Sequence, residues 1–321
     1  MQSKKQPAEI AGAINTQLER FMPIITPFGI VMGFLFPGVF IKLRPLVIWL
    51  FSTITLSGAL KLKTNEFGRT LRSPLVILLA FVFMHVIMPL IALLLSTLVF
   101  GGDIDTVSGF ILVYSAPTAV SGFIWTSMYG GNFALCLTLI LIDTILAPFV
   151  VPGTMFVLVG TRVALDMTAM AVSLILMVVA PTIVGVSANE LSKGKIPALV
   201  CPYLAPISKI SLVLVIAANT SPVAPRVRFD NPRIWLIAVL CVSLAAIGYI
   251  FSKLLGIMVK LPPEKRVTIF FSGGLRNISA VTTIAVSFFP EAAALPALLG
   301  IVFQQSTAAI MGRLLMGKRK G

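Results

Sequence analysis

Apolar runs of about 20 residues recur from one end of this 321-residue chain to the other, and a run of that length can cross a bilayer as a helix. Hydrophobic residues make up 58% of the sequence and charged residues only 11%, whereas a soluble domain carries roughly 25% charged residues. The pattern predicts an all-α polytopic membrane protein of about ten transmembrane helices, at roughly 21–40, 44–62, 73–99, 107–129, 132–159, 163–188, 198–219, 232–258, 265–289 and 290–314.

The basic residues indicate how these spans are oriented. The net charge is +14, and the lysines and arginines concentrate in the connections on the side that holds the N-terminus. Cytoplasmic connections carry such an excess, so both termini are expected in the cytoplasm, with residues 315–321 as a basic tail. The charge therefore indicates a lipid bilayer, and not nucleic acid, as the partner. Short connections favour a bacterial inner membrane.

Neither an enzyme nor a metal protein is indicated. The three cysteines lie far apart in apolar runs and His85 is the only histidine, so the sequence supports no metal site, disulfide framework or histidine-based metalloprotease motif. It contains no phosphate-binding loop and no Asp-rich motif. An intramembrane aspartyl protease needs two deep carboxylates, and only Asp143 lies deep. We expect no catalytic residues and no cofactor.

The run from Thr268 to Phe288 is apolar enough to span a membrane, but its middle is interrupted. Gly273 and Gly274 each weaken a helix by roughly 1 kcal/mol relative to alanine, and Arg276 and Asn277 follow them. A charged side chain at mid-membrane costs at least about 2.5–3.5 kcal/mol. The combination predicts a helix broken at the glycines, with freed backbone groups that face a polar cavity.

Span 4 carries a matching interruption. Its middle reads Ser115-Ala116-Pro117-Thr118-Ala119-Val120-Ser121-Gly122, and proline, glycine and hydroxyl residues there are typical of a broken helix. Spans 4 and 9 occupy corresponding places in the two halves of the chain. Such a pair indicates a transporter of two inverted repeats of about five helices each, with the breaks crossing at mid-membrane where the binding site lies.

Several stretches resemble the bile acid:sodium symporter family. They are Leu56 to Pro74, Ile87-Met88-Pro89, the segment TAVSGFIWTSMYGGNFALCLTLILIDTILAPFVVPGT, Asn277 after the second break, and Pro290-Glu291-Ala292-Ala293-Ala294-Leu295-Pro296-Ala297. The resemblance covers nearly the whole chain and rests on the order and spacing of these stretches. It suggests a bacterial homologue.

The resemblance implies a fold of two domains. A panel domain would comprise residues 1–62 and 163–225, with spans 1, 2, 6 and 7. A core domain would comprise residues 73–159 and 232–314, with spans 3–5 and 8–10, and would hold the two crossing breaks. A small or amphipathic organic anion would be transported as the core moves against the panel, and a monomer is compatible with the sequence.

The sodium-binding residues that the resemblance implies are altered. The family's pattern in the second break is an acid, then glutamine four residues later, then asparagine, but this sequence has Ser272, Arg276 and Asn277. By analogy with other hard cations, sodium needs about five or six oxygen ligands. Sodium coupling in the family's manner is therefore not expected; uniport, exchange and proton coupling are the alternatives. The remaining ligand positions of the family fall on Ser121, Gly122, Cys136, Ile140 and Met84.

Two charges occupy the same neighbourhood. Arg276 stands where the family has an ion-binding glutamine, and Asp143 shares a helical face with Cys136 and Ile140. We hypothesise that the Arg276 guanidinium replaces a sodium ion as a fixed positive charge, and that Asp143 pairs with it or carries a proton. A buried pair that only holds the breaks together is the alternative.

Other polar residues complete the candidate site. Asn277 is the first choice for a substrate contact. Lys209 in span 7 would attract the anion or else extend toward the cytoplasmic interface, and His85 would relay protons or else pack through a hydrogen bond. The predicted substrate-binding residues are Asn277, Arg276, Thr118, Ser121, Ser279 and Lys209, and the predicted residues for ion or proton coupling are Asp143, Ser272 and His85.

The sequence thus predicts a secondary transporter that moves an organic anion by alternating access, with Arg276 in place of a bound cation. A bile acid-like compound or a small carboxylate such as pantoate or a keto acid would fit. A sodium-coupled symporter with unusual ion ligands is the first alternative. A channel, or a sensor that has lost transport, is the second.

Overall fold

The structure, a computed structural model, describes residues 15, 17–18, 27–62, 74–160, 166–227 and 230–317. This part of the chain is helical, and its strand-like pairing is limited to one isolated bridge. Seven described stretches are long and apolar enough to cross a membrane: Pro37–Ala59, Pro74–Phe100, Phe133–Leu158, Met167–Leu191, Lys195–Thr220, Pro232–Met258 and Glu291–Met316.

These helices confirm the prediction of an all-α polytopic membrane protein. The count of about ten spans and the inverted repeat stay predictions. Residues 21–26 of the first predicted span and 318–321 of the predicted tail lie outside the described residues.

The chain divides into two compact units. Unit 1 comprises Met1–Thr64 and Ser173–Pro225, and unit 2 comprises Asn65–Val172 and Arg226–Gly321. The panel and core roles predicted for similar ranges stay predictions. Each unit is described by itself below.

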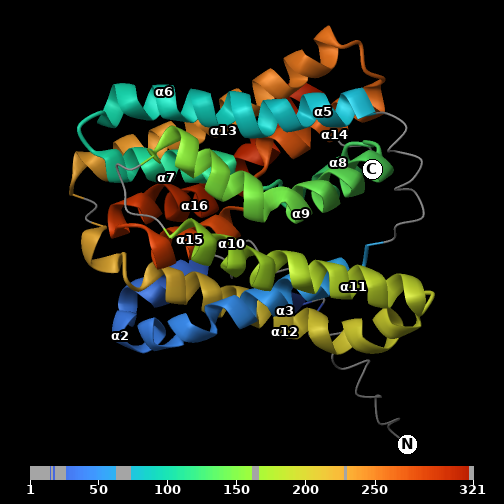
Figure 1. The fold of residues 1–321 in the computed structure, drawn as a ribbon, viewed down its shortest axis with the longest axis horizontal. Coiled ribbons are helices and arrows are strands. Elements are labelled where there is room, and N and C mark those ends of the chain that lie inside the picture. The colour runs from blue at the N-terminus through green and yellow to red at the C-terminus, as the bar shows by residue number, and fades with distance from the viewer. Residues whose placement is uncertain are drawn as a thin grey trace, which may run out of the picture. The chain divides into compact units, whose positions relative to one another are not determined.

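Unit 1 is built around α3 (Val47–Ala59), which packs against α11 (Ala180–Leu191) and α12 (Lys195–Thr220) (Figure 1). Its other helical segments are residues 27–35, α2 (Pro37–Phe40), η1 (Ile41–Leu46) and η4 (Ile175–Val179). Two short elements cross the boundary of the units: α10 (Met167–Leu174), of which only the last two residues belong to unit 1, and η5 (Ala224–Arg226).

The π-helical turn η4 shows how a proline shapes this unit. Pro181 has no N–H, so it leaves two carbonyls without a backbone donor: Met177 in the α-helical register and Leu176 in the π-helical register. Ser52 Oγ donates to Leu176 O at 2.7 Å, and Thr55 Oγ1 donates to Met177 O at 2.9 Å. Side chains of α3 therefore satisfy the acceptors that the proline frees.

Unit 2 holds the remaining helices. They are α5 (Pro74–Val82), η2 (Phe83–Ile87), α6 (Met88–Phe100), α7 (Ile104–Ser115), α8 (Gly122–Met128), α9 (Phe133–Leu158), α13 (Pro232–Met258), α14 (Pro263–Gly274), α15 (Ile278–Phe288) and α16 (Glu291–Met316). Helix α13 packs along α14 and α16, and α7 contacts both α6 and α16.

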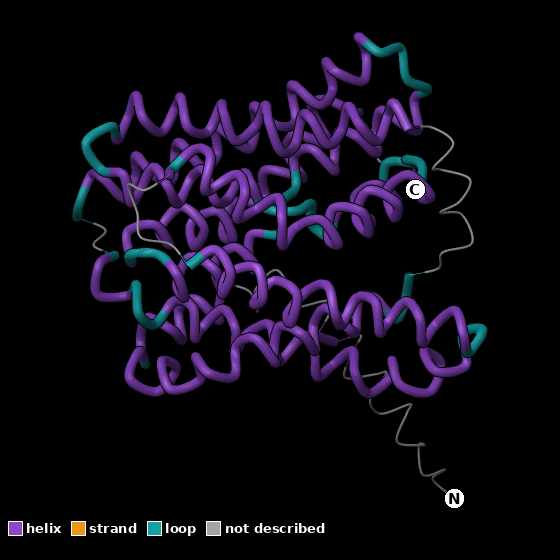
Figure 2. Tube along the Cα trace, in the orientation of Figure 1, coloured by secondary structure: helices purple, strands orange, loops and turns teal. Residues whose placement is uncertain are grey.

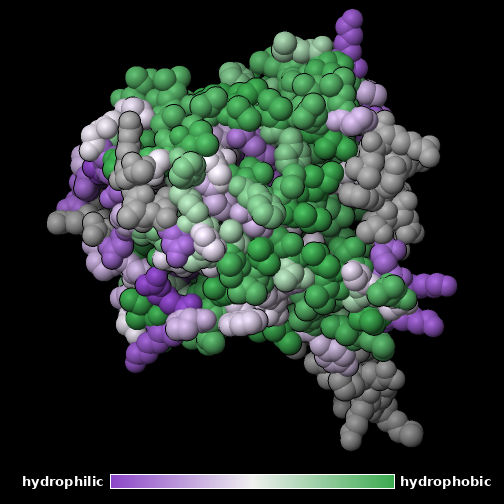
Figure 3. All heavy atoms as spheres, in the orientation of Figure 1, coloured by the Kyte–Doolittle hydropathy of each residue, from purple (hydrophilic) through white to green (hydrophobic). Residues whose placement is uncertain are grey.

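The outer surface of unit 2 is apolar. Leu98, Phe149 and Val157 are 73%, 72% and 76% exposed, and Figure 3 shows hydrophobic side chains over much of the visible surface. Exposed apolar area of this extent marks an interaction surface, and on helices of this length the partner is lipid.

Both predicted helix breaks are present in unit 2. Helix α7 ends ahead of Pro117 because a proline forces the preceding residue out of the helical region, and Ala116 accordingly has ψ 147°. Helix α14 ends at Gly274, and α15 follows the N-cap Asn277, whose Oδ1 accepts from the Ala280 N–H at 3.3 Å. Figure 2 shows these non-helical segments inside the unit.

The sequence analysis predicted that the helix breaks at Gly273 and Gly274, but the structure places the break directly after them. Gly273 and Gly274 remain inside α14, and the chain leaves the helix at Leu275. A Cβ at Gly273 would lie 2.0 Å from Ser252 Oγ, and a Cβ at Gly274 would lie 2.2 Å from the Tyr249 ring. The glycines therefore allow α14 to approach α13 closely.

Candidate functional site

The two breaks of unit 2 lie against each other, and we call residues 116–121 and 275–277 the crossover. Thr118 and Arg276 form an isolated antiparallel bridge, and the Asn277 N–H donates to Pro117 O at 2.7 Å. Backbone groups at the ends of the half-helices thus bond to one another inside the protein. Non-helical backbone at membrane depth requires such burial.

Thr118 links the crossover to its surroundings. Its Oγ1 lies 3.0 Å from Ser272 O and 3.2 Å from Leu275 O, so the hydroxyl donates to these carbonyls. Its backbone N–H donates to Asp143 Oδ2 at 2.6 Å. Thr118 is 2% exposed, and buried donors need partners of this kind.

Asp143 lies on α9 and is fully buried. Its Oδ1 lies 2.7 Å from His85 Nε2, and its Oδ2 accepts from Thr118. Each carboxylate oxygen therefore has a direct partner. The predicted pairing with Arg276 is not a direct contact: the structure describes both residues and no ion pair joins them, although their charges interact.

His85 lies in η2, a π-helical turn of the kind often found at functional sites. Its ring is buried, and the ring centroid lies 5.1 Å from that of Phe81. Nδ1 has no hydrogen-bond partner among the described residues. A proton can therefore be added at Nδ1 without breaking the bond between Nε2 and Asp143.

Arg276 is 2% exposed, and its guanidinium has few partners. Nη2 donates to Met84 O at 3.3 Å. Met84 lies five residues before Pro89, so in the π-helical register of η2 its carbonyl has no backbone N–H to accept from. Nε and Nη1 have no hydrogen-bond partner in the part of the chain that the structure describes. The guanidinium keeps donors for a further acceptor.

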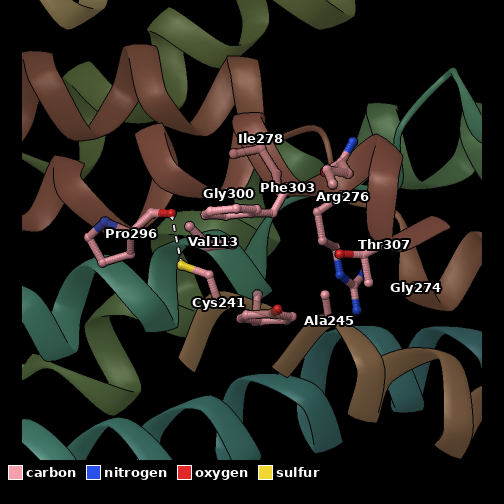
Figure 4. A pocket seen from close by; sticks show the side chains of 12 residues that line it. Val113, Cys241, Ala245, Gly274, Arg276, Ile278, Pro296, Gly300, Phe303 and Thr307 are labelled. Atoms are coloured by element: carbon pink, nitrogen blue, oxygen red, sulfur yellow. Dashed lines mark hydrogen bonds between the residues drawn. The ribbon is translucent and has the colours of Figure 1, made fainter. Parts of the chain in front are cut away.

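A cavity of about 20 Å³ adjoins Arg276, which is room for about one water molecule. Tyr114, Gln304 and Thr307 are polar residues of its lining. Figure 4 shows Arg276 and Thr307 on one side of the cavity, with the bond from the Cys241 thiol to a backbone carbonyl on the other. The cavity admits a water molecule or one small polar group, not a whole organic anion.

A second polar cluster surrounds Cys136 on α9. Cys136 is fully buried, and the hydroxyls of Thr126 and Ser272 lie near its thiol, but neither hydroxyl has a hydrogen-bond partner among the described residues. Ile140, one turn further along α9, is also buried. Sulfur is a soft ligand that suits hard cations poorly. The cluster presents two hydroxyls, a thiol and an isoleucine, and no carboxylate.

Comparison with known proteins shows the family. The model of the Sodium Bile acid symporter family matches residues 45–226. The uncharacterized protein YbaS of Bacillus subtilis is 38% identical over 294 residues, which cover 92% of this chain and 96% of that protein. The chain belongs to the Sodium Bile acid symporter family. Members of this family are membrane transporters, so the expectation that the chain is no enzyme is confirmed.

Two more distant relatives have names that mention sodium. The uncharacterized sodium-dependent transporter YocS of Bacillus subtilis is 23% identical over 283 residues, which cover 88% of this chain and 86% of YocS. The probable sodium/metabolite cotransporter BASS1 of Arabidopsis thaliana chloroplasts is 24% identical over 290 residues, which cover 90% of this chain and 71% of BASS1.

Most of the predicted site residues of this Sodium Bile acid symporter family member lie at or beside the crossover. Ser121 is the N-cap of α8, and Ser279, in the first turn of α15, accepts from the Thr283 hydroxyl through its carbonyl at 3.2 Å. Lys209 lies in unit 1 on α12, where its Nζ bonds to Asn15 Oδ1. The predicted residues in the crossover are Thr118, Ser121, Arg276 and Asn277; Asp143 and Ser272 bond to Thr118, and His85 bonds to Asp143. Roles in binding substrate or ions stay predictions.

The sequence analysis did not single out two tyrosines. Tyr114 on α7 and Tyr249 on α13 lie close enough to Arg276 to interact with its charge. Tyr114 also lines the cavity, and the Tyr249 ring packs on Gly274. The one available signal was the position of Tyr114, two residues ahead of Ala116 and the proline that ends α7.

Proposed function

We propose that this protein moves an organic anion across a membrane by alternating access, and that it does so without a sodium ion bound in the family's manner. The observation that carries the proposal is the buried Arg276 guanidinium at the crossover, which bonds to Met84 O and keeps two nitrogens without a hydrogen-bond partner among the described residues.

The charge of Arg276 disfavours a cation in its surroundings. Two like unit charges about 5 Å apart repel by roughly 3 kcal/mol at an effective dielectric constant of about 20. The carbonyl of Met84, an oxygen that a sodium ion could otherwise bind, already accepts from Arg276. The guanidinium thus supplies permanently the positive charge that a bound ion would supply.

The same charge favours an anionic substrate. Helix α15 begins at the crossover, and the N-terminus of a helix adds partial positive charge there. A carboxylate or sulfate group of a bile acid-like compound, or of a small carboxylate such as pantoate or a keto acid, fits this electrostatic environment. Guanidinium groups bind such oxyanions through parallel N–H donors.

Substitution of Arg276 tests the proposal. Purified protein in liposomes is given radiolabelled taurocholate, pantoate or pyruvate as probes. Arg276→Gln is expected to reduce uptake of the transported probe at least tenfold, because the fixed charge is lost. Arg276→Lys keeps the charge but not the planar fork, so it should retain part of the uptake. Full uptake by Arg276→Gln would contradict the proposal.

The alternative is sodium coupling through unusual ligands. The names of YocS and BASS1 favour it, since both mention sodium. In that case uptake by Arg276→Gln would still depend on sodium. The nearest oxygen ligands for the ion would be the hydroxyls of Thr126 and Ser272 and the backbone carbonyls of the crossover.

A further inference from the structure

A chain of three short contacts runs from a titratable ring to the crossover. His85 Nε2 lies 2.7 Å from Asp143 Oδ1, Asp143 Oδ2 accepts the Thr118 N–H at 2.6 Å, and Thr118 Oγ1 lies 3.0 Å from Ser272 O. The chain connects η2, α9, the first break and α14, and Thr118 Oγ1 also lies 3.2 Å from Leu275 O of the second break. A change at His85 therefore reaches the crossover through bonded atoms.

The charges around this chain sum to zero when His85 is neutral. Asp143 carries one negative charge and Arg276 one positive charge, and the two interact inside the protein. A proton on His85 leaves a net charge of one positive unit. An uncompensated charge in a low-dielectric interior is costly, so the protonated state favours a bound anion, and a bound anion favours the protonated state.

We propose that the His85–Asp143 pair binds a proton that is transported together with the organic anion. This inference rests on the proposed function, because it names the ion that is coupled to the anion. The proton adds to Nδ1 of His85, which has no hydrogen-bond partner among the described residues, while Nε2–H continues to donate to Asp143. Release of the anion then returns the site to zero charge and releases the proton.

The ionisable groups around the pair are few. Arg276 faces Asp143 from the link between α14 and α15, and its charge also interacts with Tyr114 of α7 and Tyr249 of α13. Cys136 lies two turns earlier on α9 itself. Helices α5, α6 and α8, which pack against η2 or α9, contribute no ionisable side chain. The other charged residues of α7 and α14 lie in the first turns of those helices, away from the crossover: Asp105, Glu264, Lys265 and Arg266.

Proton movement with the anion is the direct test. The protein is reconstituted in liposomes that contain a pH-sensitive dye, in sodium-free choline buffer. The anion added outside is the one of taurocholate, pantoate and pyruvate that the protein transports. We expect the lumen to acidify as the anion enters, and an inward proton gradient to increase uptake at least fivefold. Sodium-free uptake with neither effect would overturn the proton proposal and leave the proposed function standing. Uptake that requires sodium would overturn the proposed function.

Two variants separate proton binding from a structural role. Asp143→Asn removes the negative charge and therefore mimics the protonated site. The variant protein should exchange anion across the membrane at a rate that does not depend on pH, and without moving protons. His85→Gln keeps a hydrogen-bond donor for Asp143 but cannot bind the proton. This variant should move no protons, and its rate of anion uptake should not depend on pH. Thr138→Val is the matched control, since the Thr138 hydroxyl is buried on the same helix but bonds only within it, to Ala134 O.

A spectroscopic readout covers variants that fail to transport. His85 is the only histidine of the chain, so nitrogen NMR of histidine-labelled protein reports its ring alone. At a fixed pH, saturating anion should increase the imidazolium fraction at least threefold. An imidazolium fraction that the anion leaves unchanged would overturn the proton proposal.

Discussion

At the scale of single residues, prolines in two spans leave backbone carbonyls without a backbone donor, and side chains from elsewhere in the chain donate to them. Pro181 frees acceptors that Ser52 and Thr55 fill in unit 1. Pro89 frees the carbonyl of Met84, which accepts from Arg276 in unit 2. The same local chemistry thus serves packing in one unit and holds a buried charge in the other.

Pro89→Ala tests this role. Alanine restores an N–H that can donate to Met84 O, so the Arg276 guanidinium is expected to lose its bond and uptake to fall several-fold. Pro181→Ala is the control, because it restores the equivalent N–H in unit 1, and its uptake should stay within about twofold of the unmodified protein. Equal losses in both variants, measured at equal protein content, would show that Pro89 acts on folding alone.

Thr118→Val is expected to destabilise the protein. It removes the hydroxyl that bonds to the Ser272 and Leu275 carbonyls while keeping the backbone N–H for Asp143. Leu275 O still accepts from the Ala119 N–H, but Ser272 O loses the donor from Thr118, and a buried acceptor left unpaired costs about 1–3 kcal/mol. Thermal unfolding in detergent should show a lower midpoint for Thr118→Val and a nearly normal one for Thr118→Ser. A normal midpoint for the valine variant would mean that these hydroxyl bonds contribute nothing.

Individual residues were predictable where their chemistry conflicts with a membrane. Arg276 and Asp143 stand out because a charge in an apolar run is costly. Their partners were not predictable, because His85 lies 58 residues from Asp143 and Met84 lies 192 residues from Arg276 in sequence. Only the packing of η2 against the breaks brings these atoms together.

At the scale of elements, the close contact of α13 and α14 depends on glycine. The Tyr249 ring occupies the space that a side chain at Gly274 would need. The sequence predicted the place of the break within about one residue, but assigned it to the weak helix propensity of glycine. Close packing of the two helices is the stronger constraint.

Gly274→Ala should destabilise the protein by roughly 1–3 kcal/mol, as overpacking does. Its Cβ would lie 2.2 Å from the Tyr249 ring, whereas a Cβ at Gly153 on α9 meets nothing within 4 Å. Gly153→Ala is therefore the control, and it should stabilise α9 by about 0.5–1 kcal/mol. Thermal unfolding compares the two. A neutral Gly274→Ala would contradict a packing role for Gly274.

At the scale of the whole molecule, hydropathy predicted the class and most of the spans. Seven described stretches qualify by length and composition, and the halves of the two broken spans are too short to qualify. The mean hydropathy of a whole span stays high when only a few residues interrupt its helix, so hydropathy alone does not reveal a break. The breaks were found from Pro117 and from the polar residues around Arg276 instead.

The predicted orientation gives a further test. With both termini in the cytoplasm, green fluorescent protein fused after Gly321 should fluoresce, and alkaline phosphatase fused after Gly102, in the connection between α6 and α7, should be active outside. Alkaline phosphatase fused after Gly194, between α11 and α12, is the control and should be inactive. The reverse pattern would contradict the orientation.

Sodium replacement tests most directly whether a fixed guanidinium has taken the place of a bound cation. Uptake of the transported anion is measured in liposomes with sodium, potassium or choline as the only added cation, at one pH and one membrane potential. We expect the three rates to agree within about twofold. A rate in sodium at least tenfold above the other two would show that a sodium ion is bound despite Arg276.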